Sequence, residues 1–335
     1  MFTYRSVYII TIVLTILLAI ASLGMGHFAL SPTKIMMILV SPFYDHAHNA
    51  SVLEQQVIWN IRLPRILLAF FVGGGLALVG AVLQGIFYNP LVDPHIIGVT
   101  SGAAFGGTLA ILLGISTVGL MSSAFLFGML VLVLIFVITQ SLKQHNMLIL
   151  VLIGVILSGF FSALVSLMQY LADTEEKLPN IIFWLLGSFA TASWHKLLLL
   201  AIPVSAASIL LIALSWRINI LSLADHEASS LGISVFGTRT FILILCSIII
   251  AAQVAVSGSI GWIGLIIPHV ARLLVGANHQ TLLPLSFWLG GGYMILVDDI
   301  ARLISHAEVP LGIITALLGA PCFVLLLYKQ FVRKT

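Results

Sequence analysis

"IRLPRILLAFFVGGGLALVG", residues 61–80, places two arginines at the start of a long apolar run. No charged residue follows Arg65 up to Gly80. A helix that crosses a bilayer needs about 20 mostly apolar residues. Pro64 suits the first turn of such a helix, because the N–H that proline lacks has no partner there. The stretch therefore predicts a membrane-spanning helix over residues 63–87.

The composition of the whole chain extends this prediction. Of the 335 residues, 61% are hydrophobic and 7% are charged. A water-soluble domain carries about 25% charged residues, so this chain lacks the charge to cover a soluble surface. Its apolar runs do not alternate with the period of two that is typical of an outer-membrane barrel. The chain is expected to be an all-α polytopic membrane protein, and its net charge of +3 does not indicate nucleic-acid binding.

Ten apolar runs are long enough, or nearly so, to be membrane spans. We expect spans at residues 6–26, 63–87, 94–112, 117–140, 147–171, 193–215, 236–256, 259–275, 282–303 and 310–328. A further helix at 180–190 is too short to cross. No soluble domain interrupts these runs, so residues 1–335 are expected to form a single transmembrane domain.

Lysine and arginine set the orientation, because they are enriched in cytoplasmic loops. With the N-terminus inside, the basic residues at the cytoplasmic ends are Arg5, Lys143, Arg217, Arg239, Arg272, Lys329, Arg333 and Lys334. Those at the outer ends are Lys34, Arg62, Arg65, Lys177, Lys196 and Arg302. The inner set is the larger, so this orientation agrees with the excess of basic residues expected on the cytoplasmic side. It places the arginines of the opening stretch outside.

Three of these outer arginines lie beside span ends. Arg62 and Arg65 are three residues apart and therefore share a helix face. Either they reach lipid phosphates, or they form a fixed pair for an acidic partner outside. Arg302 follows Asp298 by four residues, so the two side chains can form an ion pair near the outer face. Arg302 is therefore either part of a structural pair or offered to the same outside partner.

The loop "RINILSLADHEASSLGIS", residues 217–234, is the longest on the cytoplasmic side. Ser222 and Asp225 resemble the start of a capping box, and Gly232 is a typical helix stop. These signals predict a helix of about ten residues. It is either a solvated surface helix or a docking element for a cytosolic partner. His226 and Glu227 are adjacent, which is not a metal-ligand spacing, so no metal site is expected.

The fifth span carries a polar stripe formed by Ser158, Ser162, Ser166 and Gln169. Such residues either hold helices together in lipid or line a polar passage. The chain has no G-x-x-x-x-G-K-[ST] phosphate loop, and its serines and histidines form no catalytic constellation. We therefore expect neither ATP hydrolysis nor any other catalytic site in this chain.

Five stretches resemble the FecCD-type permeases of bacterial ABC importers, which include the vitamin B12 permease BtuC. They are "RLPR" (62–65), "GAVLQGIFYNPLVDPHIIGVTSGA" (80–103), "ILSLADHEASSLGIS" (220–234), "GSIGWIGLIIPHVARLLVG" (258–276) and "AEVPLGIITALLGAPCFVLLL" (307–327). The resemblance extends from about residue 55 to 330. Within the family, the chain is similar to the molybdate/tungstate type. Other members carry metal chelates such as haem, siderophores or cobalamin.

The resemblance implies a permease subunit of the inner membrane with ten helices. A second copy of the permease, two cytosolic ATP-binding subunits, a periplasmic substrate-binding protein and membrane lipid are its implied partners. ATP and Mg²⁺ belong to the ATPase, and no cofactor is expected in this chain. The alternative is a self-contained ion-coupled secondary transporter, which needs acidic residues at mid-membrane. Acids within the expected spans are few, with Asp298 and Asp299 the main ones, and this scarcity argues against a proton-coupled pump.

The resemblance also implies roles for individual residues. Arg62, Arg65 and Arg302 match the arginines that accept glutamates of the binding protein. Residues 219–233 match the coupling helix that sits in a groove of the ATPase. Its expected contact residues are Leu221, Leu223, Ala224, Asp225, Glu227, Ala228, Leu231 and Gly232. The fifth span matches the helix that lines the pathway, through Ser158, Ser162, Ser166 and Gln169.

Overall fold

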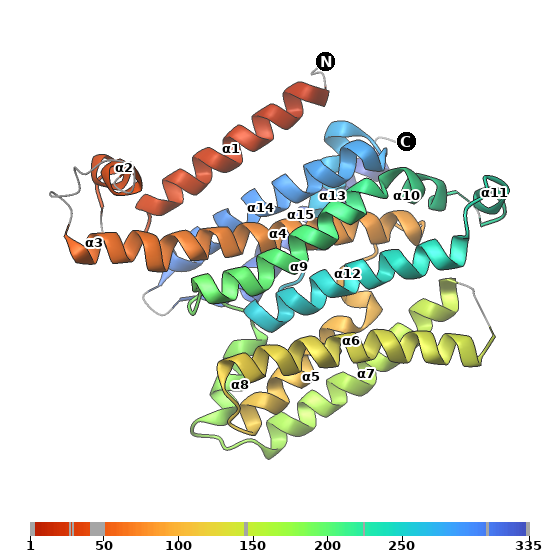
Figure 1. Cartoon of the computed structure of the whole chain (residues 1–335), viewed down its shortest axis with the longest axis horizontal. Coiled ribbons are helices and arrows are strands. Elements are labelled where there is room, and N and C mark those ends of the chain that lie inside the picture. Colours follow the sequence, from red (N-terminus) through yellow and green to blue (C-terminus); the bar gives the residue numbers. More distant parts are fainter. Residues whose placement is uncertain are drawn as a thin grey trace.

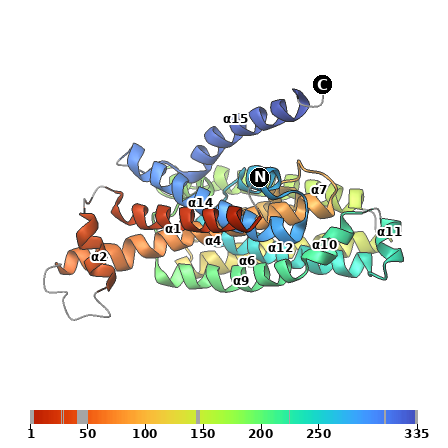
Figure 2. The ribbon, with the colours of Figure 1, turned by 90° about the horizontal axis from the view of Figure 1, so that it is seen from above.

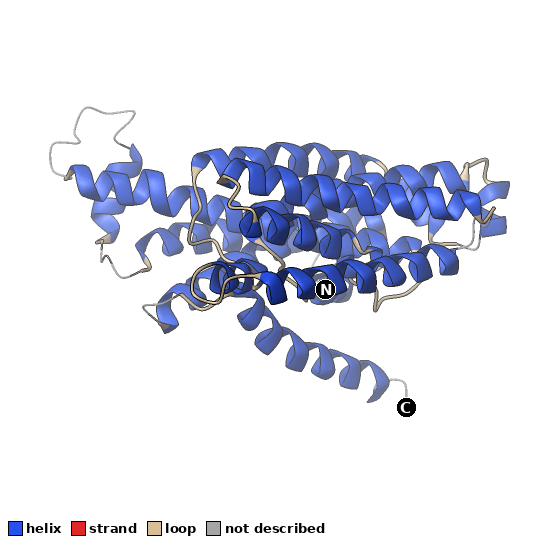
Figure 3. Cartoon of the chain, turned by 90° about the horizontal axis from the view of Figure 1, so that it is seen from below, coloured by secondary structure: helices blue, strands red, loops and turns tan. Residues whose placement is uncertain are grey.

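The computed structural model describes residues 4–26, 28, 30–40, 51–143, 147–223, 225–305 and 308–332. Within these ranges all regular structure is helical (Figure 3). The first half contains α1 (Tyr4–Gly24), α2 (Pro32–Val40), α3 (Val52–Gln56), η2 (Val57–Arg62), α4 (Leu63–Ile86), η3 (Pro94–Ile97), α5 (Val99–Leu112), α6 (Thr117–Ser141) and α7 (Met147–Leu171). The second half contains α8 (Lys177–Leu185), α9 (Trp194–Ala213), α10 (Ser215–Leu221), α11 (Asp225–Ser230), α12 (Val235–Ser257), α13 (Ile263–Val275), α14 (His279–Ile304) and α15 (Leu311–Val332).

Each of the ten expected spans corresponds to a helix. Seven helical stretches of the described chain are long and apolar enough to cross a membrane, and α5, α13 and α15 are shorter apolar helices. The largest difference is at residues 52–62, where α3 and the π-helical η2 extend α4 toward its N-terminus. A capping box between Ser51 and Glu54 starts this extension, and a capping box is a strong helix start. The fold class predicted from the sequence is confirmed.

Two expected boundaries differ because of backbone turns. The short helix expected at 180–190 is α8, which ends earlier, since Gly187 adopts a φ of 78°. The span expected at 259–275 begins only at Ile263. Gly258 and Trp262 both have a φ of 72°, so the chain turns there before α13 begins.

The helices run side by side in a bundle with α4 at its centre (Figure 1). Helices α14, α13 and α9 pack around α4, and α1 lies on α14. Helix α12 joins this group to α5 and α6, and α7 packs on the far side of α5. Helix α15 touches α13 and α14 but diverges from the bundle toward the C-terminus (Figure 2).

The central packing depends on glycines that bring helix backbones together. A Cβ at Gly80 would lie 1.9 Å from the carbonyl oxygen of Gly264 in α13. A Cβ at Gly73 would lie 2.2 Å from the carbonyl oxygen of Gly290 in α14. Helices in lipid associate through such close approaches of small residues. Helix α4 can therefore approach α13 and α14 this closely because Gly80 and Gly73 lack side chains.

Replacing Gly80 by alanine is expected to push α4 away from α13. Forcing one extra carbon into a packed contact costs about 1–3 kcal/mol. Thermal unfolding of the purified protein in detergent measures this loss. Gly159→Ala in α7 is the matched control, because a Cβ there meets nothing within 4 Å. Equal melting temperatures for the two variants would contradict the close packing at Gly80.

Candidate functional site

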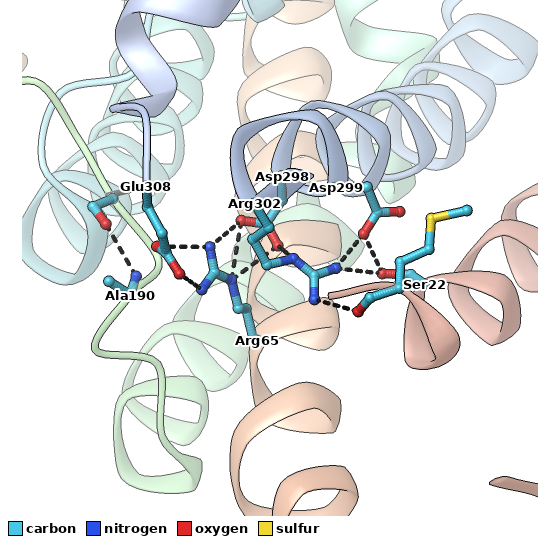
Figure 4. A network of polar contacts seen from close by, with 9 residues as sticks. Ser22, Arg65, Ala190, Asp298, Asp299, Arg302 and Glu308 are labelled. Carbon is cyan, nitrogen blue, oxygen red and sulfur yellow. Dashed lines mark hydrogen bonds and ion pairs between the residues drawn. The ribbon is translucent and has the colours of Figure 1, made fainter. Parts of the chain in front are cut away.

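The three arginines singled out in the sequence gather at one end of the bundle, called here the arginine end. Figure 4 shows two of them, Arg65 and Arg302. This end is formed by the start of α4, the end of α14 and the residues that follow α1 and α14. The opposite end carries α10 and α11 and is called the α11 end (Figure 1). The described basic residues expected outside, such as Arg65 and Lys196, lie toward the arginine end (Figure 1). Those expected inside, such as Arg217 and Arg239, lie toward the α11 end.

Arg65 joins two carboxylates. Its Nη1 and Nη2 donate to Oε1 and Oε2 of Glu308, at 2.6 and 3.0 Å. Its Nε and Nη2 donate to Oδ2 and Oδ1 of Asp298, at 3.0 and 2.8 Å. Both contacts use two parallel N–H groups, which is the strongest arrangement between a guanidinium and a carboxylate. Arg65 therefore ties α4 both to α14 and to the segment before α15.

Arg302 holds the end of α14 to the end of α1. Its Nε lies 3.2 Å from Oδ2 of Asp298, which confirms the expected ion pair four residues apart. Its Nη2 also pairs with Asp299 and donates to the Ser22 hydroxyl at 2.9 Å. Ser22 in turn donates to Asp299 at 2.6 Å. The arginine is thus enclosed by groups of its own chain.

Arg62 takes a different direction from Arg65, although the two are three residues apart. Its Nη1 and Nη2 donate to the backbone carbonyls of Leu23 and Phe28, both at 2.5 Å. Within the described ranges, no carboxylate pairs with it. Arg62 therefore fixes the end of α1 and the chain that follows it, and among the described residues backbone carbonyls accept its hydrogen bonds.

All three arginines are buried in the single chain. Arg62, Arg65 and Arg302 are only 4%, 6% and 7% exposed. Burying such charges is costly unless they are paired. Asp298, Asp299 and Glu308 pair with Arg65 and Arg302, whereas Arg62 donates to backbone carbonyls. The docking role stays a prediction. Ser22 and Glu308 also belong to the network but were not singled out from the sequence, and Asp299 was noted only as an acid within a span.

Asp298 and Asp299 bear on the secondary-transporter alternative as well. Both are paired with arginines at the arginine end, rather than standing free at mid-membrane. A coupling site for ions needs acids that lie along the ion path. The two best candidates for such acids are therefore already used in a structural network.

At the α11 end, the helix of about ten residues expected between Ser222 and Gly232 is only the six-residue α11, and α10 ends before it. The Ser222 hydroxyl donates to the carbonyl of Ile218 at 2.8 Å, so Ser222 ends α10 instead of starting a helix. Leu221 is buried at the end of α10, and Leu223 is exposed beyond it. Ala224 lies outside the described residues. The turn between the helices places α11 at the rim of the bundle (Figure 1).

Helix α11 carries the remaining residues of the expected coupling segment. Asp225 and Glu227 are exposed, whereas Ala228 is fully buried and anchors the helix. Leu231 follows as an exposed apolar side chain. Gly232 ends the segment as expected, with a φ of 79° that favours glycine.

Asp225 fixes α11 to the bundle through two long-range contacts. Nη2 and Nη1 of Arg239, in α12, donate to Oδ1 and Oδ2 of Asp225 at 2.8 and 3.3 Å. The Tyr88 hydroxyl, just beyond α4, donates to the carbonyl of Leu223 and to Asp225. The hydrogen bond from Arg239 lowers the pKa of Asp225 below its ordinary value of 3.8. The carboxylate is therefore charged at neutral pH.

Asn219 holds α10 to α14. Its Oδ1 accepts from the backbone N–H of His279 at 2.9 Å, and its Nδ2 donates to Oδ1 of Asn278 at 2.8 Å. Together with the contacts of Asp225, these bonds connect α10 and α11 to α4, α12 and α14. The coupling segment is thus mechanically linked to the centre of the bundle.

The polar stripe of α7 lies at the edge of the chain. Ser162 and Ser166 are exposed, and Ser158 and Gln169 are half-buried. The Ser166 hydroxyl donates to the carbonyl of Ser162 at 3.1 Å, within the same helix. A role for these four residues in lining a pathway stays a prediction.

Comparison with known proteins decides the family. The model of the FecCD transport family matches residues 14–329. The chain belongs to the FecCD transport family. FecCD proteins with similar sequences include the molybdate import system permease protein MolB of Haemophilus influenzae, which is 55% identical over 94% of this chain and 93% of its own length. The hemin transport system permease protein HmuU of Yersinia pestis is 36% identical over 95% of this chain and 94% of its own.

A solved structure agrees with this membership. It is described as an inward-facing conformation of a metal-chelate type ABC transporter. It is 52% identical to this FecCD chain, has a TM-score of 0.88, and the match covers 97% of this chain and 99% of the other. Together with the apolar helices, these relatives establish a membrane-spanning permease subunit of an ABC importer in the inner membrane.

Proposed function

We propose that this permease imports a metal oxyanion of the molybdate or tungstate type. The observation that carries the proposal is the 55% identity to the molybdate permease over nearly the full length of both chains. The identity to the hemin permease is 36% over a similar length. A metal chelate is therefore the second candidate for the substrate.

The proposed assembly contains two copies of this chain, two cytosolic ATP-binding subunits and a periplasmic substrate-binding protein. The chain contributes a single membrane domain and no cofactor, while ATP and Mg²⁺ bind to the ATPase. Helices α7 and α15 expose apolar side chains such as Phe160 and Leu317, which suit contacts with the second copy or with lipid. In this arrangement Ser158, Ser162, Ser166 and Gln169 line the pathway between the copies.

The arginine end is the proposed docking surface for the binding protein, through Arg62, Arg65 and Arg302. Guanidinium groups suit bidentate binding of a partner's carboxylate, and this end concentrates three of them. The α11 end is the proposed ATPase contact. Four exposed side chains lie on or next to α11 there, those of Leu223, Asp225, Glu227 and Leu231. Ala228, on the opposite face of α11, is buried against the bundle.

Reconstitution in proteoliposomes tests the function. With the ATPase subunits and the binding protein present, we expect molybdate uptake that requires ATP and stops with a non-hydrolysable analogue. Haem and a ferric siderophore serve as competing substrates. Uptake of a chelate but not of the oxyanion would contradict the proposed substrate class. Uptake by the permease without any ATPase would contradict the importer mechanism.

A further inference from the structure

Glu308 differs from the other acids of the arginine network in its position. The side chains of Asp298 and Asp299 are 2% and 3% exposed, whereas that of Glu308 is 29% exposed. Glu308 lies in the segment between α14 and α15 and approaches Arg65 from the side opposite Asp298 (Figure 4). It is therefore the carboxylate of the network that solvent, and a partner protein, reach first.

Arg65 keeps its place without Glu308. Asp298 holds the Nε and Nη2 side of the guanidinium, while Glu308 occupies the Nη1 and Nη2 end. Removing Glu308 leaves Arg65 paired and correctly oriented, with its outer pair of N–H groups unoccupied. A carboxylate from another protein fits this vacated end in the same bidentate geometry.

We propose that Glu308 is a displaceable internal carboxylate, which occupies Arg65 until an acidic side chain of the binding protein replaces it. This inference rests on the proposed docking role of the arginine end. The exchange conserves charge, because one carboxylate leaves Arg65 as another arrives. Glu308 thus competes with the binding protein and lowers its apparent affinity, as any state that blocks a site does.

The position of Glu308 also gives the exchange a structural consequence. The backbone N–H groups of Leu311 and Gly312, at the start of α15, donate to the carbonyls of Gly187 and Leu186 at 2.9 Å each. The segment before α15 is therefore held at two places, by Glu308 on Arg65 and by these bonds to the residues after α8. Displacement of Glu308 removes the first of the two. Docking at Arg65 is thereby transmitted to α15 and α8.

The test measures binding of the purified binding protein to the permease–ATPase complex in lipid nanodiscs. If Glu308 occupies Arg65 about nine-tenths of the time, Glu308→Gln is expected to tighten binding about tenfold. Glu308→Asp keeps the charge on a shorter side chain and is expected to tighten binding less. The matched control is Glu54→Gln, which removes an acid paired with Lys34 away from the network. A damaged fold does not produce a gain of affinity, so the expected result is not imitated by misfolding.

Arg62→Gln separates this inference from the docking role on which it rests. If docking uses the arginine end, Arg62→Gln weakens binding of the binding protein, and wild-type binding by this variant overturns the docking role. If Arg62→Gln weakens binding but Glu308→Gln leaves it unchanged or weakens it, the docking role stands and the displacement of Glu308 is wrong. The displacement is also wrong if Glu54→Gln tightens binding as much as Glu308→Gln does. The gain would then come from the change in overall charge and not from freeing Arg65.

Discussion

Replacing Asp298 by alanine is expected to prevent the permease from accumulating in a folded form. Asp298 is buried and is shared by Arg65 and Arg302. Its loss leaves two buried guanidinium groups with too few partners. Removing one member of a buried ion pair costs about 3–5 kcal/mol, a large part of the roughly 5–15 kcal/mol that stabilises a folded protein. The yield of monodisperse protein in detergent and its thermal unfolding measure the effect.

Two further variants distinguish this explanation from a general sensitivity to substitution. Glu175→Ala removes an exposed acid between α7 and α8, so its melting temperature is expected to equal that of the wild type. The double variant Asp298→Ala with Arg65→Met removes one of the unpaired charges along with its partner. It is expected to recover part of the stability that Asp298→Ala loses. A normal melting temperature for Asp298→Ala would show that the network does not hold α4 to α14.

The helices could largely be predicted from the sequence, because the membrane imposes a simple rule. A span needs a long apolar run, and all ten runs correspond to helices. The extension of α4 back to Val52 was missed because its residues "VLEQQVIWNIR" are too polar to read as a span. Glu54 belongs to the capping box that starts the extension, a local signal that the search for apolar runs passes over.

The partners of the arginines could not be predicted to the same extent. The pair Asp298–Arg302 was accessible because its members are one helical turn apart. Arg65 and Glu308 are 243 positions apart, and their contact depends on how α4 meets the segment before α15. Spacing along one helix could not show that Arg62 turns toward α1 while Arg65 turns toward α14. Tertiary packing decides both directions.

The coupling segment shows the same limit on a smaller scale. Ser222 and Asp225 have the spacing of a capping box, yet Asp225 is the first residue of α11 rather than its third. Ser222 ends α10, and the Asp225 carboxylate accepts hydrogen bonds from Arg239 and Tyr88. Because Tyr88 precedes Asp225 by 137 positions, the local pattern contained no sign of it. The location of the segment was predicted, but its shape follows from these distant contacts.

These contacts lead to the second large effect, a loss of transport when Asp225 is replaced by asparagine. The variant loses the charge that Arg239 pairs with, and Arg239 is buried. A hydrogen bond to a charged group contributes about 1.5–3 kcal/mol. Because the Asp225 side chain is 55% exposed, solvent screening places the effect at the lower end of this range. This corresponds to a roughly tenfold smaller equilibrium constant for the correct placement of α11. ATP-dependent uptake in proteoliposomes is expected to fall by up to about tenfold, while the permease itself stays folded.

The expected loss has a defined pH dependence and a defined control. The pKa of Asp225 is lowered by Arg239, so its contribution is fully present above the ordinary value of 3.8 and is lost only as the pH falls through the lowered pKa. The difference between wild type and Asp225→Asn is therefore expected to be constant across neutral pH. Glu175→Gln, which removes an exposed acid between α7 and α8, is expected to transport normally.

A charge swap gives the decisive comparison for the Asp225–Arg239 pair. If the pair places α11 for the ATPase, Asp225→Arg combined with Arg239→Asp restores part of the uptake that either single variant loses. Tyr88→Phe is expected to reduce uptake in the same direction but less, because it removes only the hydroxyl contacts to Leu223 and Asp225. Full uptake by Asp225→Asn would mean that α11 needs no link to α12. The motion of the ATPase would then have to enter the bundle through α10, by way of Asn219 and α14.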